Sequence, residues 1–300
     1  MAVATVRTEA RRSAAAKQRL KARLSLEFER SAVSRQTILS ASFQEPPLRV
    51  IRAFDTGDKA ALVHLHNVSG GLLGGDALEL SIKVGEGAEA QVTTTGATRI
   101  YRPRSEAADT TQNNEIDVGN GGLLELVPDA IIPFAGARFV QCTRIRLGVG
   151  AGLFWWEIMA PGRAASGEEF AYERLEWATE IRINERLVAA ERARLEPTRF
   201  SPRHPARLGT DRYLGTFYAC REGMDTRSWT TAEERLREIA TELSRESGAK
   251  FGISSLVSDG LVIRALARDG AAIATGLRVL WSAAKRILYG REAIWPRKVN

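Results

Sequence analysis

A short glycine motif recurs three times in the first half of the chain, each time between two runs of apolar residues. It reads VGEGA at residues 84–88, VGNGG at 118–122 and LGVGA at 147–151. Glycine tolerates the positive φ angles that tight connections between strands demand. The flanking runs alternate between apolar and polar residues, as at 24–28 and 78–84, which is typical of strands with one buried face. The motif therefore predicts hairpins stacked one after another in a β-rich fold.

The last quarter of the chain changes from the period of a strand to that of a helix. Thr231 and Glu234 have the spacing of a capping box, and the apolar face that follows them ends at Gly248. Residues 251–267 predict a hairpin, and residues 273–288 predict a second amphipathic helix. We therefore expect a mainly β fold, an elongated stack of many strands and hairpins with two α-helices near the C-terminus.

Residues 1–23 are predicted to form a basic, disordered tail, and residues 24–300 a single β-rich domain. Seven basic residues and one acidic residue fall within residues 1–25, whereas the rest of the chain is nearly balanced in charge. The balanced remainder argues against a broad nucleic-acid-binding face, although the tail alone could bind polyanions. An amphipathic organelle presequence is the alternative interpretation of the tail.

Composition points neither to a membrane nor to an oxidising compartment. No apolar run reaches the length of a membrane-spanning helix. Cys142 and Cys220 lie far apart and have no paired neighbours, so a disulfide framework is not expected. We expect a cytoplasmic protein.

A second glycine-rich segment, residues 70–76, has the spacing of a phosphate-binding loop but not its chemistry. Gly70 and Gly75 are followed by Asp76 and Ala77, where that loop needs lysine and a hydroxyl residue. A carboxylate would repel phosphate, and the residues that follow alternate as a strand rather than a helix. The segment therefore predicts a turn between strands and no nucleotide site.

Several polar side chains are placed where they could contact a metal ion. His64 and His66 lie two apart on a predicted strand and should face the same side. Carboxylates occur in or beside apolar strands at Asp76, Glu125, Glu157, Glu168 and Glu169. A carboxylate in such surroundings either pairs with an arginine, for which Arg99, Arg138 and Arg163 are candidates, or lines a wet passage.

No nucleophile motif stands out, so an enzyme is the weaker of two interpretations. It would use Glu157 and Glu168 as an acid/base pair on a small substrate, and it requires both carboxylates in one deep pocket.

Two blocks, residues 70–76 and 93–102, resemble the paired signature of the urease accessory protein UreD (UreH) family. Residues 126–137, 156–157, 162–168, 260–264 and 295–297 resemble further blocks of that family in the same order. The matched signature positions are Gly70, Gly71, Gly74, Gly75, Asp76, Thr94, Thr95, Arg99, Tyr101, Arg102, Gly162, Arg163, Gly167 and Glu168. Arg99 departs from the lysine that is usual in the family, which keeps the charge but changes the hydrogen-bond geometry.

The resemblance implies a non-enzymatic chaperone that scaffolds UreF and the GTPase UreG on the urease apoprotein and helps to deliver nickel to the urease active site. It implies no tightly bound cofactor, GTP only through UreG, no nucleic acid, no membrane, and room for a dimer of such heterocomplexes. The C-terminal helices and the Arg138–Phe139 region are the expected docking surfaces. The residues expected to contact nickel transiently are Asp76, Thr94, Glu125, Glu157, Glu168, His64 and His66.

Overall fold

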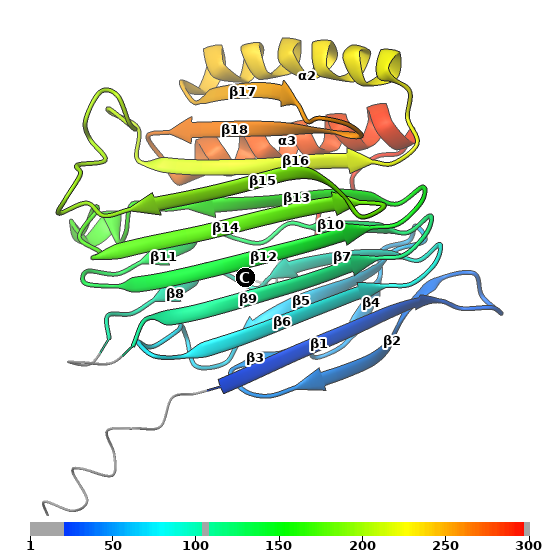
Figure 1. The fold of residues 1–300 in the computed structure, drawn as a ribbon, viewed down its shortest axis with the longest axis horizontal. Coiled ribbons are helices and arrows are strands. Elements are labelled where there is room, and N and C mark those ends of the chain that lie inside the picture. Colours follow the sequence, from blue (N-terminus) through cyan, green and yellow to red (C-terminus); the bar gives the residue numbers. More distant parts are fainter. Residues whose placement is uncertain (1–20, 104–107, 297–300) are drawn as a thin grey trace, which may run out of the picture.

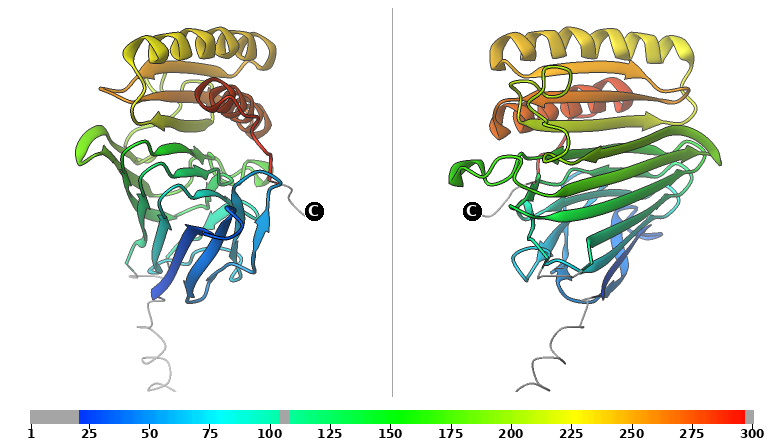
Figure 2. Two further views of the ribbon diagram at one scale, coloured as in Figure 1. Left: turned by 90° about the vertical axis from the view of Figure 1, so that its right-hand side faces the viewer. Right: turned by 60° about the vertical axis from the view of Figure 1, so that its left-hand side comes forward.

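A computed structural model describes residues 21–103 and 108–296 of the chain (Figure 1). Within these residues two β-sheets lie face to face, and two long helices flank the second sheet near the C-terminus (Figure 2). The predicted fold class is therefore confirmed. The predicted tail is too long by three residues, because residues 21–23 already belong to the first strand, and residues 1–20 lie outside the described part.

The first sheet has seven strands in the order β15-β14-β12-β9-β6-β1-β2. They are β1 (Lys21–Arg30), β2 (Thr37–Gln44), β6 (Ala77–Val84), β9 (Thr110–Val118), β12 (Arg138–Leu147), β14 (Arg174–Ile183) and β15 (Arg186–Leu195). The five central strands run parallel to one another. Hairpins add β2 and β15 antiparallel at the two edges.

The second sheet has eleven strands, and its main path runs β17-β18-β16-β13-β10-β7-β5-β3. These strands are β3 (Leu48–Arg49), β5 (Ala61–Asn67), β7 (Glu89–Thr94), β10 (Leu123–Leu126), β13 (Gly152–Met159), β16 (Tyr213–Arg221), β17 (Lys250–Ser255) and β18 (Gly260–Ala267). Three short strands lie beside this path: β4 (Ala53–Asp55), β8 (Thr98–Ile100) and β11 (Ile131–Pro133). The hairpin predicted over residues 251–267 is confirmed as β17 and β18.

The three glycine motifs connect one sheet to the other and do not form hairpins. They lie between β6 and β7, between β9 and β10, and between β12 and β13. Successive motifs stack, since the Gly119 N–H donates to the Val84 carbonyl at 2.7 Å and the Gly148 N–H donates to the Val118 carbonyl at 2.9 Å. The hairpins predicted at these motifs are therefore wrong, and the chain instead winds through both sheets in coils of parallel strands.

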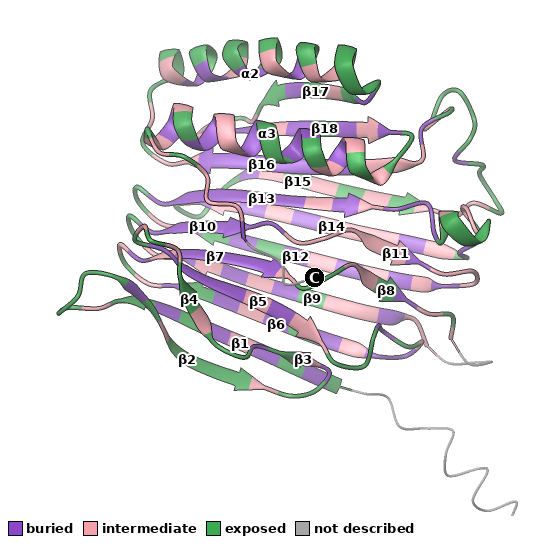
Figure 3. Ribbon diagram, turned by 180° about the vertical axis from the view of Figure 1, so that it is seen from behind, coloured by how far each residue is buried: buried purple, intermediate pink, exposed green. Residues whose placement is uncertain are grey.

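The apolar core has two main layers, and Figure 3 marks the buried residues along both sheets. One layer fills the space between the sheets, and the other lies between the second sheet and the helices. Strand β13 contributes to both, with Leu153 and Trp155 in the first layer and Phe154 and Trp156 in the second. Its nearly continuous apolar sequence, GLFWWEIM, fits a parallel strand that is covered on both faces.

The two long helices are α2 (Thr226–Ser247) and α3 (Gly270–Tyr289), and a single 3-10 turn, η1 (Ala164–Ser166), precedes β14. Helix α2 begins five residues before the predicted capping box, because the Asp225 carboxylate accepts a hydrogen bond from the Ser228 N–H at 2.9 Å. Thr231 lies inside the helix, where its hydroxyl donates to the Arg227 carbonyl. Neither of these helices, and no other in the described ranges, is long and apolar enough to span a membrane.

Candidate functional site

The residues of the two signature blocks meet at one end of the sheets, which we call the loop end. It is formed by the loops that precede the parallel strands β6, β9, β12 and β14. Gly71 and Gly74 lie so close to Tyr101 and Pro103 that a Cβ atom at either glycine would overlap them. Glycine is therefore required at both positions by close packing of one signature block on the other.

Asp76 holds the glycine loop together from within. Its carboxylate accepts a hydrogen bond from the Leu73 N–H at 2.8 Å, and its side chain is buried. Burial raises the pKa of Asp76, and the hydrogen bond from Leu73 partly opposes this shift. Since the chain continues into strand β6 and not into a helix, the loop lacks the helix N-terminus of a phosphate site.

A row of polar side chains crosses the interior between the two sheets. In the first sheet Asn114, Thr143 and Thr179 occupy one register across β9, β12 and β14 and point into the interlayer. The Asn114 amide donates to the Thr143 hydroxyl at 2.9 Å. Two residues further along the same strands, towards the glycine motifs, the corresponding register is Ile116, Ile145 and Ile181. The polar side chains thus form a belt across the interlayer, with apolar residues towards the glycine motifs and a smaller apolar cluster, which includes Leu78, Phe139 and Leu175, at the loop end.

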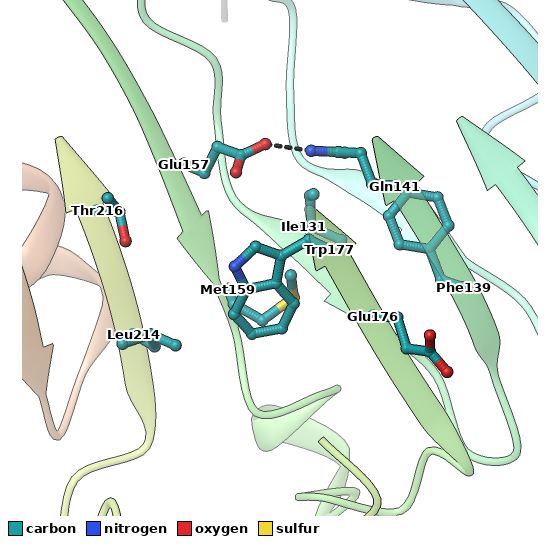
Figure 4. A pocket seen from close by; sticks show the side chains of 9 residues that line it. All are labelled: Ile131, Phe139, Gln141, Glu157, Met159, Glu176, Trp177, Leu214 and Thr216. Atoms are coloured by element: carbon teal, nitrogen blue, oxygen red, sulfur yellow. Dashed lines mark hydrogen bonds between the residues drawn. The ribbon is translucent and has the colours of Figure 1, made fainter. Parts of the chain in front are cut away.

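Glu157 faces this polar row from strand β13. The Gln141 amide of β12 donates a hydrogen bond to its carboxylate (Figure 4), and both side chains line a small cavity of ≈ 20 Å³. Ile131, Phe139, Met159, Trp177 and Leu214 supply the apolar wall, while Glu176 and Thr216 complete the lining.

No basic side chain in the described residues forms an ion pair with Glu157. Burial raises the pKa of Glu157 to about 7; the Gln141 hydrogen bond lowers it and the neighbouring Glu191 raises it. The residue as a whole is of intermediate exposure, and it lines the cavity. At neutral pH Glu157 is therefore only partly ionised, and a nearby cation would favour its charged form.

A second carboxylate borders the same region. Glu191 of β15 accepts a hydrogen bond from the Tyr218 hydroxyl at 2.7 Å and forms an ion pair with Arg264 of β18. Arg264 also donates to the Thr216 hydroxyl at 2.9 Å, and Thr216 lies beside Glu157 in the sheet register. Sequence reasoning missed Gln141 and Glu191, although polar residues at inward positions of alternating strands were a usable signal.

Glu125 has a structural role under helix α3. Its two carboxylate oxygens accept hydrogen bonds from the Lys285 ammonium at 2.7 Å and the Trp281 indole N–H at 2.8 Å. Both charged side chains are at most 3% exposed. Burial raises the pKa of Glu125, and the Lys285 charge opposes that shift. Because Lys285 already neutralises its charge and both side chains are buried, Glu125 is a poor ligand for a passing cation.

Glu168 lies on the surface of the loop end. It forms a two-pronged ion pair with Arg163, in which the Nε to Oε2 distance is 2.9 Å. That guanidinium lowers the pKa of Glu168. Glu168 does not line the cavity that holds Glu157, so the two carboxylates do not share a pocket as an acid/base pair would require.

His64 and His66 both line a groove on the outer face of β5, as their spacing predicts. Phe54 packs edge-on against the His64 ring, and Trp295 forms another wall. Thr94 at the end of β7 donates a hydrogen bond to the Asp129 carboxylate at 3.1 Å. His204 lies in the loop before β16, where its ring nitrogen accepts a hydrogen bond from the Ala206 N–H.

The predicted metal-contacting residues are thus dispersed. In residues 21–103 and 108–296 there is no group of three or more His, Cys, Asp or Glu side chains placed around one ion position. The region at Arg138–Phe139 does not form the exposed docking surface that we expected. Phe139 is buried in the core, and Arg138 forms an ion pair with Asp109. Among the predicted acids in these described residues, Glu157 lines a small interior cavity and forms no ion pair.

Comparison with known proteins agrees with the gathering of the signature at the loop end. A family model described as UreD urease accessory protein matches residues 20–300. The urease accessory protein UreD of Herpetosiphon aurantiacus is 38% identical over 282 residues, which cover 94% of this chain and 97% of that protein. Proteins of the same name from Bacillus sp. and Pseudomonas aeruginosa are 30% and 34% identical, over 88% and 84% of this chain and 94% and 85% of theirs. The chain therefore belongs to the UreD family of urease accessory proteins, and its role lies in urease maturation.

Proposed function

We propose that this chain scaffolds UreF and the GTPase UreG on the urease apoprotein and passes Ni²⁺ through the space between its two sheets. The observation that carries the proposal is Glu157, a carboxylate in an interior cavity without a cationic partner. Burying such a charge is costly, and the cost is offset when a cation lies beside it. A passing divalent ion would supply that charge.

The ligands around Glu157 suit an ion in transit. The carboxylate, the Gln141 amide and the Thr216 hydroxyl are oxygen-bearing groups that contact the same cavity. A closed set of four or more strong ligands would trap nickel, whereas a few weak contacts let it leave. The site therefore fits a transient contact better than a resident metal centre.

A chain of amide and hydroxyl side chains between the sheets supports a route from the loop end to Glu157. Gln112 of β9 lines the opening beneath the signature loops, and its amide donates to Asn114 at 3.0 Å. Asn114 continues to Thr143, and Gln141 lies opposite Gln112 in the strand register. Towards the glycine motifs, the isoleucine register offers no ligand to an ion, so the route would keep to the belt of polar side chains.

The scaffolding part of the proposal rests on the family and on the unsuitability of the glycine loop for binding GTP. We assign GTP binding to UreG, because the glycine loop of this chain lacks the lysine of a phosphate-binding loop. It also leads into a strand, where a phosphate-binding loop leads into a helix. Docking surfaces for UreF and urease must then lie on the exposed loops, strand edges or helices of this chain.

Replacement of Glu157 by glutamine tests the nickel route. The amide keeps the size and the hydrogen-bonding capacity of the side chain but removes its charge, so nickel transfer should weaken by about tenfold or more. The measurement is urease activity after co-expression with urease and its other accessory proteins at limiting nickel. Glu79→Gln, on the outer face of β6, is the matched control and should leave activity unchanged.

Two outcomes would contradict the proposal. Full urease activation by the Glu157→Gln variant at limiting nickel would remove the interior route. Undiminished urease activity after deletion of the gene from a urease-positive host would remove the maturation role as a whole.

A further inference from the structure

The glycine loop presents two apolar side chains to solvent at the loop end. Val68 is 64% exposed and Leu73 is 48% exposed, whereas the adjacent Leu72 is fully buried. A partner that covered Leu73 would remove this exposed apolar surface from water. We call Val68, Leu73 and the neighbouring Arg99 and Arg102 the loop-end surface.

The backbone beneath this surface is rigid. The Leu72 N–H donates to the Arg99 carbonyl and the Tyr101 N–H donates to the Leu72 carbonyl, both at 2.8 Å. On the inner side, the Asp76 carboxylate and the Thr110 hydroxyl hold the Leu73 N–H and carbonyl. Because the loop is already ordered, little conformational entropy would be lost when a partner binds it.

The described part of the loop-end surface carries two positive charges. Arg99 and Arg102 are exposed, and neither forms an ion pair with a described residue. Arg99 donates one long hydrogen bond, 3.4 Å, to the Gly70 carbonyl. The nearby carboxylates are already engaged: Asp76 points into the loop, and Glu168 is paired with Arg163.

We propose that the loop-end surface docks an acidic segment of a protein partner in the urease-maturation assembly, with Leu73 as the apolar anchor and Arg99 and Arg102 as carboxylate ligands. Arginine is enriched among the residues that contribute most of the binding energy in protein interfaces. A nucleic acid would call for a longer basic stripe, and two arginines around exposed leucine and valine do not provide one. The inference rests on the proposed function and adds the place and the chemistry of one contact.

The test uses the full-length tagged chain co-expressed with UreF, UreG and the urease subunits. Each protein captured with the tag is quantified at about 0.1 M and about 0.5 M NaCl, since salt screens exposed charge pairs. The double variant Arg99→Glu/Arg102→Glu should capture at least one of the three partners about tenfold less well, and Leu73→Asp should weaken the same partner. The control Arg186→Glu/Arg192→Glu makes the same charge change on exposed arginines of β15 and should capture all three normally.

Thermal melting of each variant checks that the fold is retained, which we expect because all three changed residues are exposed. Unchanged capture by the Arg99/Arg102 double variant would overturn the docking surface and leave the proposed function standing. Failure of the unmodified chain to capture any of the three would instead contradict the proposed function. Binding of a duplex DNA oligonucleotide that is lost in the same variant, with normal protein capture, would assign the surface to nucleic acid and also overturn the inference.

Discussion

Replacement of Lys285 by methionine should lower the free energy of unfolding by about 3–5 kcal/mol, the usual cost of removing one partner of a buried ion pair. Lys285 is 3% exposed and lies 2.7 Å from the Glu125 carboxylate, which is 2% exposed. Methionine fills much of the same volume, but it leaves the Glu125 charge with the Trp281 N–H as its remaining hydrogen-bond donor. Urea unfolding of the full chain, followed by tryptophan fluorescence, measures the change.

Two matched variants separate lost charge pairing from lost packing. Lys83→Met, on the exposed face of β6, should change stability by no more than about 0.5 kcal/mol. The double variant Glu125→Gln/Lys285→Met removes both charges and should regain most of the stability that Lys285→Met loses. A Lys285→Met protein within about 1 kcal/mol of the unmodified chain would contradict the structural role assigned to this pair.

The stability of the folded chain should fall as pH rises through Glu157. The pKa of this group is raised to about 7 from an ordinary 4.5, so the folded state holds its proton more tightly than the unfolded state does. Its contribution is therefore fully present below pH 4.5 and is lost as pH rises towards and through 7. The loss amounts to about 3 kcal/mol when complete.

Glu157→Gln should abolish this dependence, because the amide does not titrate. The variant should match the unmodified chain near pH 4.5 and exceed it in stability by about 3 kcal/mol near pH 8. Urea midpoints at the two pH values, with Glu79→Gln as the control, measure the difference. If Glu157→Gln changed the stability equally at both pH values, the pKa of Glu157 would not be raised in the folded chain.

Local patterns in the sequence predicted the elements better than their connections. Alternation found the strands at β1, β6 and β7, and the helical period found α3. The glycine motifs were interpreted as hairpins because a hairpin turn and an arch between two sheets make the same local demand on the backbone. They differ in which strands pair afterwards, and that depends on contacts about 30 residues away along the chain.

The sequence predicted some residues of the candidate site but not which side chains would lie around them. Glu157 was recognised as an acid inside an apolar strand, yet its surroundings come from β12, β15 and β16. Glu125 also lies within an apolar strand, but it forms a buried ion pair because Lys285 contacts it from helix α3. In the sequence Lys285 resembled an ordinary basic residue near a helix end, and only the packing of α3 on the second sheet shows that it is buried.

The stacked glycine arches also constrain how the chain reaches its native state. To pair β6 with β9, or β9 with β12, the chain must close a loop of about 30 residues. The entropy of loop closure is lost before the new contacts stabilise the pair, which makes this step slow. The hairpin of β17 and β18 needs only neighbouring residues. We therefore expect pulse-labelling hydrogen exchange to show protection in β17 and β18 before β9, and protection in the reverse order would contradict this. Until the coil closes, its apolar strand faces remain open to other chains, so synthesis alongside its partners would favour correct folding over aggregation.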